Sequence, residues 1–285
     1  MQIVEQFIQG KLDDPATCED ALVVTDHLVA VIDGATDRAS PLINGQSTGK
    51  LASDLIARTL ENLSLQDLSP QDPTNAIADT PKSLFDHLCG LIAERMDHPD
   101  WPATASAPVC TVALYLPARR QVWRLGDPWV RIGDEVHGKR YRFEEAAIEN
   151  RRAWINALLK AGHTVDELLA DDPARAAYAP MAPLFRTMMN PPADQIDDWS
   201  AGTITNRPAP TALIDVLDVP APCDSVILAT DGWPFCPATL AEAQHALSDK
   251  LTRDPLLIGD DFAAAKGHYP GQTSFDDRCW VRLVP

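Results

Sequence analysis

The sequence is poor in basic residues. Its 285 positions hold 24 Lys and Arg against 41 Asp and Glu, which gives a formal net charge of −17. Proteins that bind nucleic acid need a basic face, and proteins that dock on anionic lipid need a polybasic patch. The shortage of basic residues argues against both classes. Hydrophobic residues still make up 45% of the chain, so it can bury a core and is not a disordered acidic tail.

Long apolar runs are also missing. No window approaches the roughly 18 apolar residues that a membrane helix needs. The opening stretch MQIVEQFIQGKLDD has neither the basic start nor the long apolar core of a signal peptide. The six cysteines include no C-x-x-C pair, and a chain of this length does not need disulfides. We therefore expect a cytoplasmic protein with reduced thiols and no membrane partner.

Several familiar catalytic motifs are incomplete. GQSTGK at residues 45–50 has one residue too few between its glycines for a phosphate-binding P-loop. The same stretch fits the G-x-S-x-G elbow of a serine hydrolase, but the residues before Ser47 make a poor strand. We interpret Ser47 or Thr48 as a helix cap and keep the serine hydrolase as an alternative. Val31 stands where a haloacid-dehalogenase-type phosphatase has its nucleophilic Asp, and no H-E-x-x-H zinc motif occurs.

The order of apolar patterns predicts an α+β fold. Short β-branched or aromatic runs predict strands within residues 20–33, 109–133, 212–218, 224–230 and 278–284. Helical spacing of apolar residues predicts helices over 48–63, 82–96, 143–170 and 238–251, with a further one near 258–266. Residues 171–210 are Pro-rich and irregular. Runs of strands separated by helices favour antiparallel sheets with helices packed on their outer faces.

Acidic residues stand at the ends of five predicted strands. They are Glu19 with Asp20, Asp33, Asp127, Asp231, and Asp276 with Asp277. An Asp–Gly pair after a strand is usually only a turn, because Gly accepts a positive φ and Asp bonds to its own backbone. Strand ends of one sandwich can meet at one rim, however, and clustered carboxylates repel one another unless they are protonated or bind cations. Since carboxylate oxygens suit Mg²⁺ or Mn²⁺, the pattern predicts a divalent-metal site.

Five motifs carry a resemblance to a known family. In chain order they are CEDALVV, AVIDGAT, VWRLGD, VILATDGW and SFDDRCWVRLV. Together they resemble the metal-dependent protein serine/threonine phosphatases of type 2C, in a divergent, bacterial-like form, from about residue 18 to residue 284. The resemblance implies a four-layer α-β-β-α sandwich, with two central antiparallel sheets flanked by helix pairs. It also implies a single domain over residues 1–285, with a family-atypical helical and Pro-rich insertion at about 140–205.

The resemblance further implies a metal site with two ions, Mg²⁺ or Mn²⁺. Asp33 would bridge the two ions, and the carbonyl of Gly34 would bind one of them. Asp231 and Asp276 would complete the other, with Asp276 preferred to Asp277 because the family uses the first residue of that pair. Two ions about 3.5–4 Å apart can activate a shared water and neutralise charge on the phosphoryl oxygens. Asp33 and Asp231 would thus be catalytic through the metal-activated water.

Three further acidic residues have implied roles around this site. Glu19 and Asp20 would hold metal-bound waters, and Asp127 stands where bacterial members bind a third ion. The implied reaction is hydrolysis of phosphoserine or phosphothreonine, so the expected partner is a phosphorylated protein or peptide.

The sequence departs from the family at the groups that grip phosphate. The Arg that often precedes the first acidic pair is missing from residues 14–17, and Ala35 replaces a His that often follows the first Asp–Gly. Basic residues that could substitute are Arg38, Arg124, Arg151, Arg152 and Arg186. Two alternatives therefore stay open. One is a weakly active or inactive relative that serves as a binding or regulatory module, and the other is a phosphatase of small phosphorylated metabolites.

Overall fold

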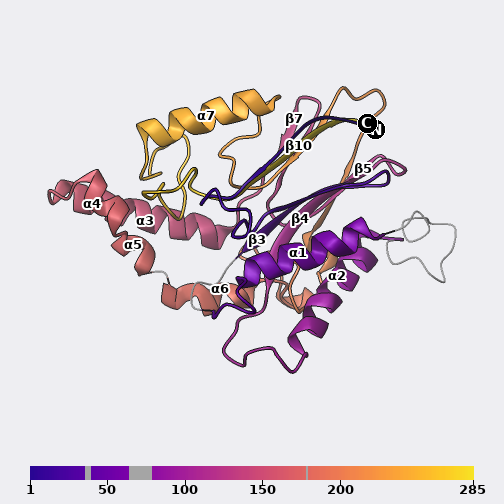
Figure 1. Ribbon diagram of the computed structural model, residues 1–285, viewed down its shortest axis with the longest axis horizontal. Coiled ribbons are helices and arrows are strands. Elements are labelled where there is room, and N and C mark those ends of the chain that lie inside the picture. The colour runs from indigo at the N-terminus through magenta and orange to yellow at the C-terminus, as the bar shows by residue number, and fades with distance from the viewer. Residues whose placement is uncertain (36–39, 64–78, 178) are drawn as a thin grey trace.

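Two five-stranded antiparallel sheets lie face to face at the centre of the protein (Figure 1). The computed structural model describes residues 1–35, 40–63, 79–177 and 179–285. Sheet A has the strand order β1 (Gln2–Gln9), β10 (Arg278–Val284), β9 (Val226–Ala229), β6 (Trp129–Ile132) and β7 (Glu135–His137). Sheet B has the order β2 (Ala21–Val24), β3 (Val29–Ala35), β4 (Val109–Leu116), β5 (Gln121–Leu125) and β8 (Ile214–Asp218).

Helices cover the outer face of each sheet. Helices α1 (Thr48–Glu61) and α2 (Pro81–Met96) pack on sheet B, and α7 (Leu240–Arg253) packs on sheet A (Figure 1). The layers therefore run helix, sheet, sheet, helix, and the predicted α+β sandwich is confirmed.

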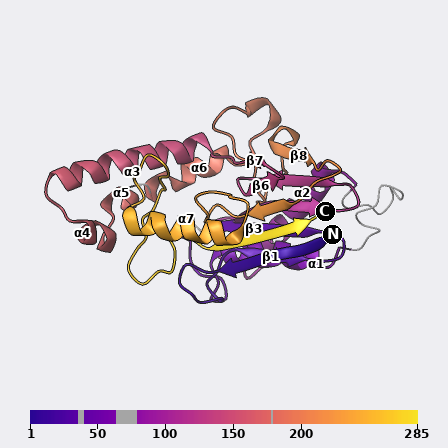
Figure 2. The same cartoon turned by 90° about the horizontal axis from the view of Figure 1, so that it is seen from above.

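The insertion lies beyond one end of the sheets (Figure 2). It contains α3 (Arg142–Lys160), α4 (Val165–Ala170), α5 (Pro173–Ala176) and α6 (Ala182–Met188). Short 3₁₀ turns lie before α6 at Ala179–Met181 and after it at Ala193–Gln195, and a third, Thr211–Leu213, lies beyond the insertion. Apart from α3, these are pieces of seven residues or fewer, in keeping with the many prolines of this stretch.

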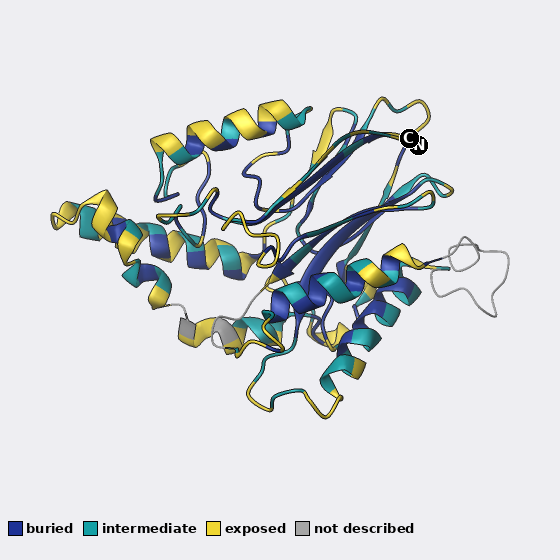
Figure 3. Cartoon of the chain, viewed as in Figure 1, coloured by how far each residue is buried: buried dark blue, intermediate teal, exposed yellow. Residues whose placement is uncertain are grey.

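The core follows from the alternation of side chains along the strands. On β3, Val29 and Val31 pack between the sheets, whereas Ala30 and Ile32 pack against the helices on sheet B. Because both faces of sheet B are covered, its central strand β4 is buried at every position. Figure 3 shows the sheets as the buried centre of the molecule, with exposure concentrated on the outer sides of the helices.

Strand β1 is an element that sequence patterns did not predict. It pairs antiparallel with β10, with Gln2 opposite Val284 and Gln9 opposite Arg278. Its residues alternate between exposed and half-buried, as expected of an edge strand with several Gln and Glu side chains. The pairing carries the segment after β1 to the start of β10, which matters for the site described below.

Two helical predictions need correction. The helix expected over 143–170 is broken, because α3 ends at Lys160 and Gly162 adopts a φ of +101°, a left-handed conformation that ends helices. The helix expected near 258–266 is a loop containing an isolated bridge between Ile258 and Ala263. The carboxylate of Asp254 accepts hydrogen bonds from the backbone of this loop and so favours the turn over a helix.

All six cysteines are free thiols. Among the helices of the described ranges, none combines the length and apolarity needed to span a bilayer.

Candidate active site

Five aspartates gather at one rim of the sandwich. Asp33 lies in β3, Asp127 and Asp231 follow β5 and β9, Asp20 directly precedes β2, and Asp276 lies two residues before β10. Each carboxylate acts on at least one of the others strongly enough to affect its pKa. The structure therefore brings together the five aspartates that the motifs singled out, which we call the aspartate cluster.

Four members of the cluster have raised pKa values. Burial is the largest cause for Asp20, Asp33, Asp127 and Asp231. The negative charge of Asp231 is the second cause for Asp33 and for Asp127, and it helps to raise the pKa of Asp127 to about 7. In the described part of the chain, none of these four carboxylates forms an ion pair with Lys, Arg or His. Lys266 and Arg140 offset part of the charge of Asp231 from a distance, and a proton or a bound cation would relieve the remaining repulsion.

Hydroxyl groups orient two of these aspartates. Thr230 Oγ1 donates to Asp20 Oδ2 at 2.6 Å and accepts from the backbone N–H of Cys279 at 2.8 Å. Thr111 Oγ1 donates to Asp127 Oδ1 at 3.0 Å. Both threonines lie on or next to strands of the sandwich, so the carboxylates are held by the same framework that carries the strands.

Two glycines of the motifs allow the backbone to pack closely at the rim. A Cβ on Gly34 would lie 2.5 Å from the carbonyl oxygens of Glu19 and Gly49, and a Cβ on Gly232 would lie 1.9 Å from the carbonyl oxygen of Asp277. These distances are shorter than any real Cβ contact, so each Asp–Gly pair serves packing as well as a turn. Close packing at Gly232 sets Asp231 next to the segment that carries Asp276.

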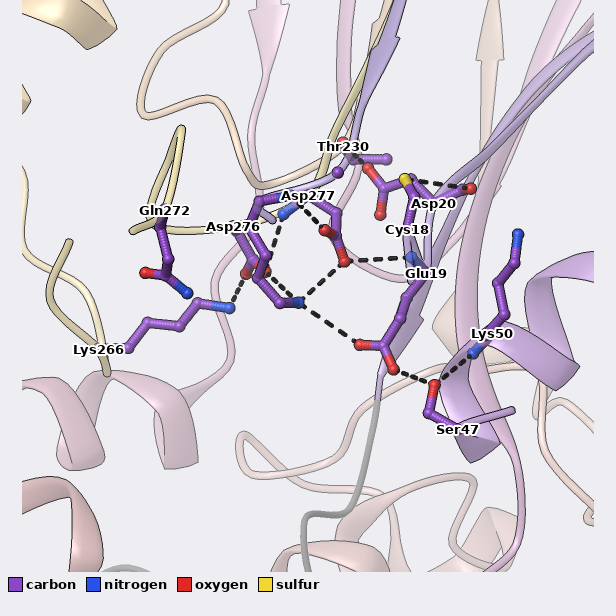
Figure 4. A network of polar contacts seen from close by, with 12 residues as sticks. Cys18, Glu19, Asp20, Ser47, Lys50, Thr230, Lys266, Gln272, Asp276 and Asp277 are labelled. Atoms are coloured by element: carbon purple, nitrogen blue, oxygen red, sulfur yellow. Dashed lines mark hydrogen bonds and ion pairs between the residues drawn. The ribbon is translucent and has the colours of Figure 1, made fainter. Parts of the chain in front are cut away.

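Asp276 differs from the other four aspartates because two lysines neutralise it (Figure 4). Lys11 Nζ lies 3.3 Å from Asp276 Oδ1, and Lys266 Nζ contacts Oδ2. Burial alone would raise the pKa of Asp276, but the Lys266 and Lys11 ammonium groups lower it below its ordinary value.

Asp277, next in the chain, is buried and fixes the segment after β1. It accepts hydrogen bonds from Lys11 N at 2.7 Å, from Lys11 Nζ at 2.9 Å and from Glu19 N at 3.1 Å. Asp277 thus holds the backbone, whereas Asp276 faces the cavity described next. Asp276 is the member of the pair that was preferred as the site residue, and that role stays a prediction.

Glu19 is placed beside the cluster but has partners of its own. Its carboxylate lies 3.6 Å from Lys11 Nζ and accepts a hydrogen bond from Ser47 Oγ. Ser47 Oγ also accepts from Lys50 N at 3.2 Å, which makes Ser47 the N-cap of α1. The interpretation of Ser47 as a helix cap is confirmed.

A cavity of about 1030 Å³ opens over the cluster. Asp127, Asp231 and Asp276 line one side of it. The insertion and the segment just before it line the other side with basic, acidic and aromatic side chains, which we call the wall: Lys139, Arg140, Phe143, Glu144 and Arg175. Burial and then the charges of Asp127 and Asp231 raise the pKa of Glu144, so the wall lies close enough to the cluster to sense its charge.

Arg140 is the basic residue of the wall that forms neither an ion pair nor a side-chain hydrogen bond among the described residues, although its charge acts on Glu144 and Asp231. Its guanidinium lies 5.0 Å from the centroid of the Phe262 ring, and among the described residues no carboxylate lies within ion-pair distance of it. Lys139, by contrast, pairs with Asp215 at 3.6 Å. Arg175 donates to the hydroxyl of Tyr269 at 3.3 Å. Arg140 therefore keeps hydrogen-bond donors available to a ligand in the cavity.

The arginines suggested by the sequence are engaged elsewhere. Buried Arg124 pairs with Asp215 and donates to two backbone carbonyls, and buried Arg151 pairs with Asp172 and donates to two others. Arg152 pairs with Asp260. Arg186 donates to the carbonyl of Ala107 at 3.5 Å, and Arg38 lies outside the described residues.

Sequence analysis missed Lys11, Lys266, Arg140 and Glu144. None of them adjoins a recognisable motif. Lys11 contacts Asp277, which lies more than 200 positions away in the sequence. Lys266 contacts Asp276, which lies 10 positions away. The residues next to each lysine therefore give no signal of its role.

The donor set suits a hard divalent cation, since it consists of carboxylate oxygens. As the side chains stand, however, no three His, Cys, Asp or Glu residues of the described ranges are arranged to hold one ion. The five aspartates are near neighbours, but Asp276 is turned to its lysines, and Asp33 and Asp231 share a side-chain hydrogen bond. Binding a cation therefore requires the carboxylates to draw together.

Comparison with known proteins bears out the fold. The structure is similar to the serine/threonine phosphatase PstP/Ppp of Mycobacterium tuberculosis, with a TM-score of 0.50 and 15% identity over 99% of this chain and 98% of that chain. The catalytic domain of PstP in complex with two manganese ions gives a TM-score of 0.46 and 14% identity, over 99% and 98% of the two chains. Phosphatase Stp1 from Staphylococcus aureus gives 0.45 and 13%, over 100% and 95%.

No family model matches the sequence, and no curated protein matches it either. At 15% identity, the similarity to PstP/Ppp shows a shared fold over the whole chain. The fold implied by the type 2C resemblance is therefore confirmed. Activity is a separate question, because one fold can host many functions.

Proposed function

We propose that this protein is a metal-dependent phosphatase that hydrolyses phosphoserine or phosphothreonine. The observation that carries the proposal is the set of four carboxylates, Asp20, Asp33, Asp127 and Asp231, which are gathered at one rim with raised pKa values and form no ion pair with Lys, Arg or His among the described residues. Such an arrangement is costly to the fold unless it serves to bind a cation. The shared fold with a serine/threonine phosphatase supports this assignment.

Mg²⁺ or Mn²⁺ would be held by Asp33 and Asp231, with the carbonyl of Gly34 as a further donor. A divalent cation bound there supplies an activated water and neutralises charge on the phosphoryl oxygens. Asp20, fixed by Thr230, would orient water at the site, as would Glu19. Asp127 would add its negative charge beside the bound cation, since it lines the cavity together with Asp231.

Arg140 would grip the phosphate in place of the missing family Arg. Its guanidinium faces the cavity, has no carboxylate partner in the described part of the chain and is backed by the Phe262 ring. Arginine binds phosphate well because its planar fork can donate two parallel hydrogen bonds to phosphoryl oxygens. The positive charge would offset part of the negative charge that the cluster presents to an anionic substrate.

The cavity favours a phosphorylated side chain on a peptide over a small metabolite. Its volume of about 1030 Å³ lies just above the range of about 300–1,000 Å³ that is usual for small-molecule sites. Phe143 and Phe262 offer apolar surface to residues that flank the phosphorylated one.

We also propose that residues 1–285 form one domain, with the insertion as its cavity wall. Buried Arg151 of α3 supports this, because it donates to the carbonyls of Leu256 and Ala264 in the loop after α7. Tyr141, just before α3, likewise donates to the carbonyl of Gly202 at 3.0 Å.

The test of the function is hydrolysis by the full chain. We expect release of phosphate from p-nitrophenyl phosphate and from a phosphothreonine peptide in manganese, and no release after addition of a chelator. Peptide cleavage at a lower KM than that of a phosphorylated sugar would support the peptide as substrate class. A protein that binds manganese and hydrolyses neither substrate would contradict the proposal.

A binding or regulatory role is the second candidate, and the lysines on Asp276 are the observation that favours it. Calorimetry separates the two functions. A phosphothreonine peptide that binds to the manganese-loaded protein and is recovered uncleaved would indicate a binding module, whereas cleavage would indicate the enzyme.

A further inference from the structure

Asp276 presents both of its carboxylate oxygens to groups of this chain. Oδ1 accepts from Lys11 Nζ at 3.3 Å and from the backbone N–H of Asp277 at 3.0 Å, and Oδ2 contacts Lys266 Nζ. Three donors on two oxygens leave little capacity for a further ligand. Asp276 therefore differs in kind from Asp33 and Asp231, whose carboxylates have no cationic partner within ion-pair distance in the described residues.

The two lysines are built into the fold from separate elements. Lys11 follows β1, and its backbone N–H donates to Asp277 at 2.7 Å, so the side chain starts from a fixed point. Lys266 belongs to the loop between α7 and β10 and lines the cavity. About a fifth to a quarter of each side chain is exposed, so neither is a freely moving surface lysine.

A lysine ammonium and a divalent cation compete for the same carboxylate. They repel each other at the few-ångström separation that a shared ligand imposes, and this repulsion is weakly screened away from bulk water. The resemblance described above implies two ions, of which one is completed by Asp231 and Asp276. The ammonium groups of Lys11 and Lys266 would compete with that ion for Asp276.

We propose that Lys11 and Lys266 stand in for one of the two divalent cations, so that the cluster binds a single ion, at Asp33 and Asp231, and Asp276 serves as the counter-ion of the lysines. This inference rests on the proposed function, because it assumes that the uncompensated carboxylates bind a metal. It narrows that function to a site with one metal and two ammonium groups.

The experiment counts bound ions on the full chain by calorimetric titration with Mn²⁺. We expect one ion per wild-type chain and two ions per chain in the Lys266→Gln variant and in the Lys11→Met, Lys266→Gln double variant. Asp276→Asn should leave the single wild-type ion in place, with its affinity changed by less than about tenfold, whereas Asp33→Asn should abolish it.

Lys139→Gln is the matched control. Lys139 also lines the cavity, but it pairs with Asp215 and not with the cluster, so its loss should leave the count at one. Because Lys11 also supports the backbone near Asp277, circular dichroism is measured for each variant. Lys266→Gln alone decides the result if the double variant does not fold.

Two ions bound to the wild type would overturn the inference and leave the proposed function intact, as would an unchanged count in folded Lys266→Gln. One ion in the wild type and two in Lys266→Gln, without hydrolysis in either, would support the inference and contradict the proposed function. A wild type that binds no ion would overturn both.

Discussion

The aspartate cluster and the wall face each other across one cavity, but they are held in place by different means. The cluster is carried by backbone ladders, as shown by Asp33, which pairs in register with Thr111 across β3 and β4. The wall is carried by side chains, as shown by Arg151, which reaches three partners from α3. Ladders position atoms within a rigid sandwich, whereas the wall depends on a few long-range contacts.

This difference indicates a division of labour. The rigid rim is suited to chemistry, which needs atoms held within a fraction of an ångström. The wall is suited to choosing what enters, because it contributes charge and apolar surface and little backbone. Changes to the cluster should therefore reduce kcat, and changes to the wall should mainly affect KM.

The strongest test of this division removes a carboxylate from the cluster. Asp33→Asn or Asp231→Asn should lower kcat on p-nitrophenyl phosphate by at least about 100-fold, because each removes a proposed ligand of the cation. Asp218→Asn, at the end of β8, is the control, since Asp218 is an exposed strand-end carboxylate bonded to Gln121 and lies outside the cavity lining. Equal activity of Asp33→Asn and Asp218→Asn would show that the cluster is structural.

Without bound metal, the aspartate cluster should make the stability of the protein depend on pH. The folded protein keeps protons on carboxyl groups with raised pKa values, such as Asp127 at about 7, whereas the unfolded chain releases them near pH 4. Between about pH 4 and 7 the folded state binds more protons than the unfolded state. In chelator, the free energy of unfolding of the protein therefore falls as pH rises.

Thermal unfolding checks this expectation. The contribution should be visible as a steeper fall of Tm with pH in the chelated wild type than in Asp127→Asn, which cannot take up that proton. Saturating manganese should raise Tm at pH 7.5 by about 5 °C or more. Identical Tm curves with and without manganese would mean that the cluster binds no cation.

A milder effect is expected from the wall. Arg140→Ala should raise KM for a phosphothreonine peptide by about tenfold, equivalent to about 1.4 kcal/mol, and change kcat less than twofold, because Arg140 contacts the proposed phosphate and not the cation. Arg142→Ala is the neighbouring control, since Arg142 pairs with Asp198 outside the cavity. A fall in kcat without a change in KM would contradict the proposal that the wall affects substrate binding and the cluster affects catalysis.

The parts of the site that could be predicted from the sequence are those fixed by local pattern. Asp33, Asp127 and Asp231 each adjoin a short apolar strand and a glycine, so a few neighbouring residues predict both the strand and the turn. Lys266 lies in a segment whose apolar spacing predicted a helix. Lys11 follows strand β1, which was not predicted because it contains several Gln and Glu residues. Arg140 acquires its role only because the insertion folds back over the rim. The residues next to Arg140 in the sequence do not predict that fold.

The pairing of β1 with β10 has a consequence for how the protein is made. The ribosome makes β1 before β10, and the two must find each other across a loop of some 270 residues. Sheet B can assemble from segments that emerge earlier, but Asp276 and the strand that supports it emerge after the other strands of the two sheets. A growing chain that has not reached residue 276 lacks two of the carboxylates that pair with Lys11, so the segment that leads into β10 also completes the charge balance of the site.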